Sequence, residues 1–185
     1  MIDAALRPRP RLRFRRTRRP ILAPSLAGIV IVATLATNPL HPVVLFNATP
    51  SEPPGLYAAS LAPVRVGGLV AFKAPAAAFP YADRKLGYLH HTLMLKAVAA
   101  GPGDLVCAAT NRLVINDQDR APIAATDGEG RALPRWLGCR QLGPDELFVF
   151  SARVPNSFDS RYFGPVSRAA VVGVFQPLLV DDRRA

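Results

Sequence analysis

One serine in the 185-residue chain has surroundings that suit nucleophilic chemistry. Ser51 lies in "NATPSEPPGLY", directly after Pro50 and shortly before Pro53 and Pro54. Prolines restrict the backbone, so they could hold the Ser51 hydroxyl at a fixed angle before any substrate arrives. Thr49 could donate its hydroxyl, together with the Ser51 backbone N–H, to the oxyanion of a tetrahedral intermediate.

A serine nucleophile needs a base, and one lysine is suited to that task. The chain has 20 arginines but only three lysines. Lys73 and Lys85 lie in polar surroundings and are predicted to be solvated surface charges. Lys96 lies inside the apolar run "LMLKAVAA", where burial would lower the pKa of its amine. A neutral lysine can act as the general base for a serine. The alternative is structural: a turn fixed by prolines, and a lysine that reaches out to solvent.

The elements that would position this pair are mostly strands. Short β-type runs are separated by turn signals such as "GPGD", "NDQD", "TDGEG" and "LGPDE". The chain has 19 prolines and 13 glycines, which argues against a helical bundle. We therefore predict a mainly β fold, with "TDGEGRALP" as a hairpin excursion. The predicted strands are Val64–Lys73, Gly87–Ala100, Asp104–Ala108, Arg112–Asn116, Glu146–Phe150 and Ala169–Leu179.

The N-terminal part of the chain predicts a membrane segment. Residues 1–20 carry eight arginines and one aspartate, and residues 21–40 contain no ionisable side chain. About 20 apolar residues are enough to cross a bilayer. By the positive-inside rule, residues 1–20 would be cytoplasmic, residues 21–40 a transmembrane helix, and residues 41–185 an exported domain. A cleaved secretory signal with Thr34, Leu35 and Ala36 near the cut, or a buried core helix, are the alternatives.

Charge and cysteine usage agree with an exported domain. The formal net charge is +10, but residues 1–20 contribute +7 of it, so the remaining residues are only slightly basic. A nucleic-acid partner is therefore not expected. The only two cysteines, Cys107 and Cys139, could form one disulfide in an oxidising compartment, or could be reduced core thiols. The chain shows no cluster of residues suited to zinc, and no cofactor or metal is expected.

Four sequence blocks in the same order resemble the type I signal peptidase family, in particular its conjugative-transfer, TraF-like branch. The blocks are "NATPSEPPGLY", "VRVGGLVAF", "LMLKAVAAGPGDLV" and "NSFDSRYFGPV", and they cover about residues 44–175. The resemblance implies a signal-peptidase/LexA-like β-fold, with a periplasmic serine peptidase domain at the cytoplasmic (inner) membrane of a bacterium.

The resemblance also implies roles for individual residues. Ser51 would be the nucleophile, Lys96 the base, and Ser157 the residue that orients the lysine amine. Asp159 and Arg161 would brace the site. Asp159 would belong to the catalytic group by tuning or positioning the Ser–Lys pair, or would form a purely structural pair with Arg161 or Arg153. The implied substrates are exported precursors such as conjugative pilin, which the enzyme would cleave or cyclise. The sequence does not decide between those two outcomes.

Other functions remain open at this stage. A Ser-His-Asp hydrolase would need His41, His90 or His91 as its base, but the chain has no G-x-S-x-G motif. If His90 and His91 are on a strand, they point to opposite faces, and at most one of them can enter the site. A LexA-like self-cleaving regulator would be cytosolic with a DNA-binding head, unlike residues 1–40. A non-enzymatic periplasmic scaffold of a conjugation or secretion apparatus is the remaining alternative.

Overall fold

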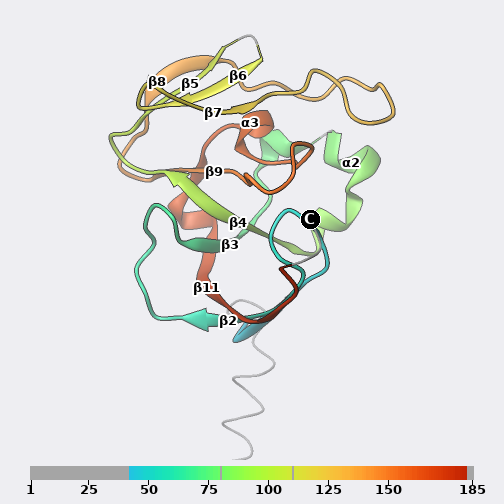
Figure 1. Ribbon diagram of the computed structural model, residues 1–185, viewed down its shortest axis with the longest axis vertical. Coiled ribbons are helices and arrows are strands. Elements are labelled where there is room, and N and C mark those ends of the chain that lie inside the picture. Colours follow the sequence, from blue (N-terminus) through green and yellow to red (C-terminus); the bar gives the residue numbers. More distant parts are fainter. Residues whose placement is uncertain (1–41, 80, 110, 183–185) are drawn as a thin grey trace, which may run out of the picture.

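Two antiparallel sheets make up most of the fold (Figure 1). The computed structural model describes residues 42–79, 81–109 and 111–182. The strands there are β1 (Val44–Asn47), β2 (Gly55–Ser60), β3 (Leu69–Lys73), β4 (Leu93–Ala100), β5 (Leu105–Ala109), β6 (Arg112–Ile115), β7 (Gln118–Pro122), β8 (Gly138–Gln141), β9 (Glu146–Val149), β10 (Val166–Ser167) and β11 (Val171–Val180). The larger sheet has the order β1-β2-β11-β3-β4-β9-β10, and the smaller has the order β7-β6-β5-β8. The predicted mainly β fold is confirmed.

The helices are short and lie in the connections. They are η1 (Ala76–Ala78), α2 (Tyr81–Lys85), η2 (Gly87–His90), α3 (Ser160–Phe163) and η3 (Arg168–Ala170), where η marks a 3₁₀ helix. Within the described ranges, no helix has both the length and the apolar character needed to cross a bilayer. The predicted cytoplasmic segment at residues 1–20 and the predicted anchor at residues 21–40 lie outside those ranges.

Alternating side chains on the central strands divide the core into three clusters of buried residues. On β3, Val70 and Phe72 pack into one cluster, while Ala71 between them packs into another on the opposite face. Strand β9 alternates in the same way: Val149 joins the first cluster, and Phe148 joins the core beneath the smaller sheet. This period of two is what a strand buried on both faces requires. Strand β9 belongs to the larger sheet, and its alternating side chains contribute to both of these clusters.

Three predicted strands begin later than expected. The run Val64–Lys73 becomes strand only at Leu69, because Gly67 has φ +83° and forms a turn with its neighbours. The run Gly87–Ala100 starts with the 3₁₀ helix η2, and its strand starts at Leu93. The C-terminal run starts with η3, and β11 begins at Val171. In each case a turn residue or a local helix precedes the apolar alternation.

The prediction that His90 and His91 lie on a strand was wrong. His90 ends η2, where its Nε2 lies 2.5 Å from Asp83 Oδ1 and its ring stacks on Phe79. His91 follows in a turn. Lys85 is an exposed surface charge, as predicted, and its amine forms a 2.7 Å ion pair with Glu129 on the hairpin excursion. That hairpin is present, with a bridge between Thr126 and Ala132.

A disulfide joins two neighbouring strands of the smaller sheet. Cys107 on β5 lies opposite Cys139 on β8, and the two are bonded, as predicted from the cysteine count. They are 32 residues apart in the sequence, so the bond removes conformational freedom from a long stretch of the unfolded chain. In the chain-entropy model, a loop of this length contributes roughly 3–4 kcal/mol of stability. The described residues contain no free cysteine.

Candidate active site

Ser51 lies in the turn between β1 and β2, and Asn47 organises that turn. The register pairs Asn47 with Gly55 at the end of the hairpin. The Asn47 side-chain amide donates to the carbonyl oxygens of Thr49 at 2.9 Å, Glu52 at 2.8 Å and Pro53 at 3.3 Å. Gly55 has φ +142°, and a Cβ there would lie 2.2 Å from the Leu179 carbonyl oxygen on β11. The turn thus needs a glycine at its end as well as prolines within it.

Strand β4 turns Lys96 into the interior. Because side chains alternate along a strand, Lys96 shares a face with Met94 and Val98, which are both in the core. Only 6% of Lys96 is exposed to solvent. Burial lowers the pKa of the Lys96 amine, and the negative charges of Asp159 and Glu52 oppose that effect. The neutral amine is therefore accessible at a lower pH than for a solvated lysine.

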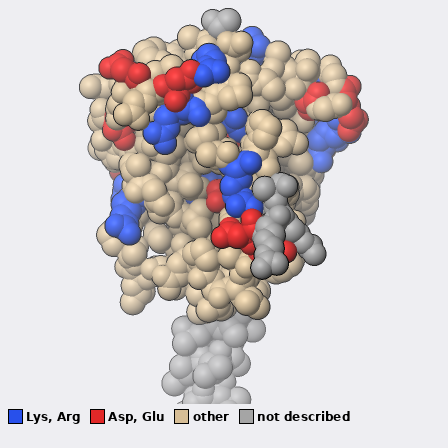
Figure 2. All heavy atoms as spheres, viewed as in Figure 1, with Lys and Arg blue, Asp and Glu red and all other residues tan. Residues whose placement is uncertain are grey.

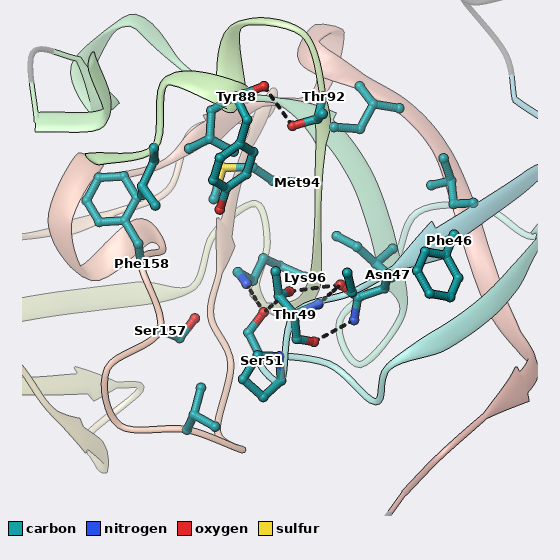
Figure 3. Close-up of a pocket in the computed structure, with 18 of the residues that line it drawn as sticks. Phe46, Asn47, Thr49, Ser51, Tyr88, Thr92, Met94, Lys96, Ser157 and Phe158 are labelled. Atoms are coloured by element: carbon teal, nitrogen blue, oxygen red, sulfur yellow. Dashed lines mark hydrogen bonds between the residues drawn. The ribbon is translucent and has the colours of Figure 1, made fainter. Parts of the chain in front are cut away.

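The two residues meet at hydrogen-bond distance. Lys96 Nζ donates to Ser51 Oγ at 2.5 Å, although the residues are 45 positions apart in the sequence (Figure 3). When the amine is neutral, the same contact lets Ser51 donate its hydroxyl proton to the Lys96 nitrogen. Ser51 and Lys96 thus have the direct contact that a serine nucleophile and its base would require.

Thr49 lies beside the nucleophile. Its Oγ1 is 3.2 Å from Ser51 Oγ and donates to Asn47 Oδ1 at 2.8 Å. A bond from Thr49 to an oxyanion, as the sequence predicts, would require its hydroxyl hydrogen to turn away from Asn47. The geometry places Thr49 within reach of that role.

Asp159 and Arg161 form an ion pair in the interior. Arg161 Nε lies 2.8 Å from Asp159 Oδ1, and a second bond of 2.9 Å joins its guanidinium to Oδ2. Both side chains are buried, and Asp159 also caps α3 by accepting from the Arg161 backbone N–H. A short chain of bonds leads from this pair to the nucleophile. The Ser151 backbone N–H donates to Asp159 Oδ2, and the Ser151 hydroxyl donates to the Ser51 carbonyl oxygen.

Replacing Arg161 by alanine should lower the free energy of unfolding by about 3–5 kcal/mol, because Asp159 would remain buried without its counter-charge. Chemical denaturation can be followed by the fluorescence of Trp136, the only tryptophan, whose ring packs against Phe148. The matched control is Arg112→Ala, since Arg112 pairs with Asp119 at the surface and both side chains are about half exposed. That variant should lose less than about 1 kcal/mol. Equal losses in the two variants would contradict the bracing role of the buried pair.

Ser157 lies in the site without the bond that was predicted for it. It is almost fully buried and contributes to the lining of the cavity next to Lys96 (Figure 3). The described residues offer its Oγ no hydrogen-bond partner, and no bond joins it to the Lys96 amine. Its orienting role therefore stays a prediction.

A cavity of about 390 Å³ opens onto the Ser51–Lys96 contact. The segment Leu93–Lys96 of β4 lines it on one side, and Leu45–Ser51 on another. Leu86, Tyr88, Leu89, Thr92, Val154 and Asn156–Phe158 complete the lining. Neither His90 nor His91 contributes to it, so the described histidines do not supply a base. The described part of the chain also holds no group of three or more His, Cys, Asp or Glu side chains arranged to bind a metal.

Sequence reasoning missed three residues that support the site: Asn47, Glu52 and Ser151. Asn47 had a usable signal, because an asparagine just before a tight turn often bonds to the backbone that follows it. Ser151 had none, since it lies 100 residues from Ser51 in the sequence. Glu52 resembled an ordinary surface residue between a serine and two prolines, yet it is buried.

Comparison with known proteins shows that the chain matches a known protein family. Residues 19–179 match the family model described as signal peptidase, peptidase S26. The chain is 33% identical over 174 residues to the plasmid transfer protein TraF of Escherichia coli, covering 86% of this chain and 97% of that protein. It is 36% identical over 147 residues to the conjugal transfer protein TraF of Agrobacterium fabrum strain C58, covering 74% and 82%.

A likeness to a solved structure is weaker. Signal peptidase I from Enterococcus faecalis aligns with a TM-score of 0.38 and 21% identity, covering 62% of this chain and 98% of that one.

Proposed function

Because the chain belongs to the signal peptidase (peptidase S26) family, we propose that it is a serine endopeptidase with Ser51 as nucleophile and Lys96 as general base. The observation that carries the proposal is the 2.5 Å contact between Lys96 Nζ and Ser51 Oγ at the edge of a cavity. Family membership alone leaves the reacting residues open, and this contact supports Ser51 as the nucleophile and Lys96 as its base.

The proposed reaction has two halves. The Ser51 oxygen attacks the carbonyl carbon of the scissile peptide bond, and its proton passes to the neutral Lys96 amine. Thr49 and the Ser51 backbone N–H stabilise the oxyanion that forms. Lys96 then gives the proton to the leaving amine as the carbon–nitrogen bond breaks. An acyl-enzyme on Ser51 remains.

The acyl-enzyme can be resolved in two ways. Water attacks with Lys96 again taking the proton, which gives hydrolysis. If the substrate's own N-terminal amine attacks instead, a new peptide bond closes a ring. In both cases Ser51 regains its proton from Lys96, and the reaction as written needs no cofactor. Asp159, Arg161 and Ser157 act on the dyad through its position and its electrostatic surroundings.

We place the substrate among exported precursor polypeptides of a conjugative transfer or type IV secretion system, such as a pilin. The names of the relatives, plasmid transfer and conjugal transfer protein TraF, support this class. The active domain would face the periplasm, with residues 21–40 anchoring it in the cytoplasmic membrane. Exposed apolar residues suit a position at the bilayer surface, and they lie on the two strands that flank β2: Val44 and Phe46 on β1, Leu178 and Leu179 on β11. Figure 2 shows charged side chains over the upper and middle parts of the face in view, and few at its lower end.

The test is mass spectrometry of candidate precursors incubated with the purified full chain. A precursor cut after a defined residue would support hydrolysis, and a product lighter than the cut fragment by one water would support ring closure. If every candidate stays intact at equimolar enzyme, the proposed endopeptidase activity is contradicted, and a scaffold role in the same apparatus becomes the better explanation.

Turnover should rise with pH. Only the neutral amine can accept the Ser51 proton, and burial lowers the pKa of Lys96, so the active fraction increases as the pH passes through that lowered value. The measurement is the initial rate of precursor cleavage between about pH 5 and pH 10. The shape of this pH–rate profile, bell or plateau, reports the pKa values of the essential groups. An optimum on the acid side, with the rate falling as the pH rises, would contradict Lys96 as the base.

A further inference from the structure

Glu52 is a buried carboxylate beside the nucleophile for which the proposed reaction has no use. It follows Ser51 directly, and only 7% of it is exposed. Glutamate is rarely buried to this extent unless it is paired, because leaving water is costly for its charge. The position is also not forced by the chain, since a turn flanked by prolines normally faces solvent. The burial of Glu52 therefore needs a specific reason.

That reason is a hydrogen bond to the strand that carries the base. Glu52 Oε1 accepts from the Ala97 backbone N–H at 3.2 Å. The Ala97 carbonyl oxygen accepts from Phe150 N, which follows the last residue of β9. Strand β3 pairs with Ala97 on one side of β4, but on the other side β9 ends at Val149, so no strand residue there accepts from the Ala97 N–H. The Glu52 side chain occupies that place and satisfies the amide.

Two successive residues of the turn therefore bond to two successive residues of the strand. Ser51 bonds to Lys96 through their side chains, and Glu52 bonds to Ala97 through its carboxylate. The Ser151 hydroxyl holds the Ser51 carbonyl oxygen from another part of the fold, and the Glu52 bond adds a second attachment to β4 itself, which fixes the direction of the turn relative to that strand. A misplacement of about 1 Å in such a pair can cost about 10²-fold in rate.

We propose that Glu52 is a positioning residue for the dyad: its carboxylate ties the Ser51 turn to strand β4 and places a second negative charge beside the Lys96 amine. The inference rests on the proposed function, in which Lys96 must lose its proton. The carboxylate thus has a geometric and an electrostatic effect, and substitutions can separate them.

The electrostatic effect depends on the groups that surround the pair. Lys96 is influenced by Asp159, Glu52 and Arg161. Asp159 already forms two bonds with Arg161, whose positive charge offsets its effect on the amine. Burial raises the pKa of Glu52. The positive charge of Lys96 is the largest of the effects that lower it. The other charged or titratable groups that couple to Glu52 are Arg153, Asp159 and Tyr57.

Two variants separate the effects. Glu52→Gln keeps a side-chain oxygen to accept from Ala97 N but removes the charge. It should retain turnover at high pH, while its rate profile moves to lower pH, because the protonated amine loses a favourable neighbour. Glu52→Ala removes both the bond and the charge. Its turnover should fall by up to about 10²-fold even at pH values where the amine is neutral.

The decisive readout does not depend on activity. With only three lysines, a chain labelled with ¹³C at lysine Cε gives three signals, which Lys73→Arg and Lys85→Arg variants assign. Glu52→Gln should lower the titration midpoint of the Lys96 signal. The matched control is Glu129→Gln, which removes one carboxylate at the surface beside Lys85 and should leave the Lys96 midpoint unchanged.

An unchanged Lys96 midpoint in Glu52→Gln would overturn the electrostatic part of the inference. Full turnover in a folded Glu52→Ala variant, with its fold checked by Trp136 fluorescence, would overturn the geometric part. Failure of the proposed function gives a different result: the wild-type chain would cleave no precursor, while Glu52→Gln would still lower the Lys96 midpoint. That last outcome would support the coupling between Glu52 and Lys96 without the peptidase.

Discussion

Replacing Ser51 by alanine should reduce precursor cleavage by at least about 10³-fold, because the variant has no oxygen to form the acyl-enzyme. The Lys96 amine, the ion pair of Asp159 with Arg161 and the cavity would all remain, so binding of the precursor should persist while turnover is lost. The measurement is single-turnover cleavage followed by mass spectrometry, with a binding assay on the same preparation.

The matched control for this variant is Ser60→Ala. Ser60 ends β2, and its hydroxyl accepts only from the nearby Ala62 N–H among the bonds that the structure records for it. It should cleave at the wild-type rate. Unchanged processing by Ser51→Ala would point to another nucleophile, or to a protein that supports the transfer apparatus without catalysis.

Replacing Lys96 by arginine should abolish turnover to a similar extent, at least about 10³-fold, although the positive charge is kept. Arginine stays protonated at every workable pH and cannot accept the Ser51 proton. The loss should persist up to pH 10, which distinguishes a missing base from a base with an altered pKa. The measurement is the rate of cleavage across the full pH range.

Lys73→Arg is the control for that substitution, since Lys73 lies exposed at the end of β3. It should leave both the rate and the pH profile unchanged. Appreciable cleavage by Lys96→Arg, rising with pH as in the wild type, would contradict the role of Lys96 and would require a different group to accept the proton.

Strands β3, β4, β5, β6, β9 and β11, and the pairing of Ser51 with Lys96, could be predicted from local pattern, whereas β1 and β2 on either side of Ser51 were missed. Lys96 stood out because an apolar run with a single lysine is costly to bury, and the alternation of β4 turns its side chain inward as that pattern implies. Ser51 stood out because of its prolines. The disulfide followed from counting, since Cys107 and Cys139 have no other partner in the chain. For the strands, Lys96 and Ser51 the signal is contained in a few neighbouring residues, whereas the pairing of the cysteines needs only their number in the chain.

Strands β7 and β8 at the edges of the smaller sheet could not be predicted, because their sequences carry no clear alternation. Strand β7 reads "QDRAP", and four of its five residues are exposed. Strand β8 reads "GCRQ" and is exposed throughout. Such strands are held by backbone bonds to a neighbour and by the disulfide, rather than by burial of one face. A pattern of apolar side chains is the main sequence signal for a strand, so strands of this kind leave little trace.

The residues that support the Ser51–Lys96 pair could not be predicted from local sequence pattern either. Glu52 and Ser151 act through partners 45 and 100 residues away, and nothing next to them in the sequence indicates those partners. Asp159 and Arg161 were named only through the family resemblance, and the structure shows the ion pair between them. Their effect on turnover remains a prediction.

The measurement that tests the central claim most directly is detection of the acyl-enzyme. The wild-type chain is mixed with excess precursor, quenched with acid during the first turnover, and digested for mass spectrometry. We predict that the peptide containing Ser51 gains the mass of the precursor fragment on the N-terminal side of the cut less one water, and that Lys96→Arg shows no such adduct. Cleavage through a complete first turnover without an adduct on Ser51, or with an adduct on another residue, would contradict the account.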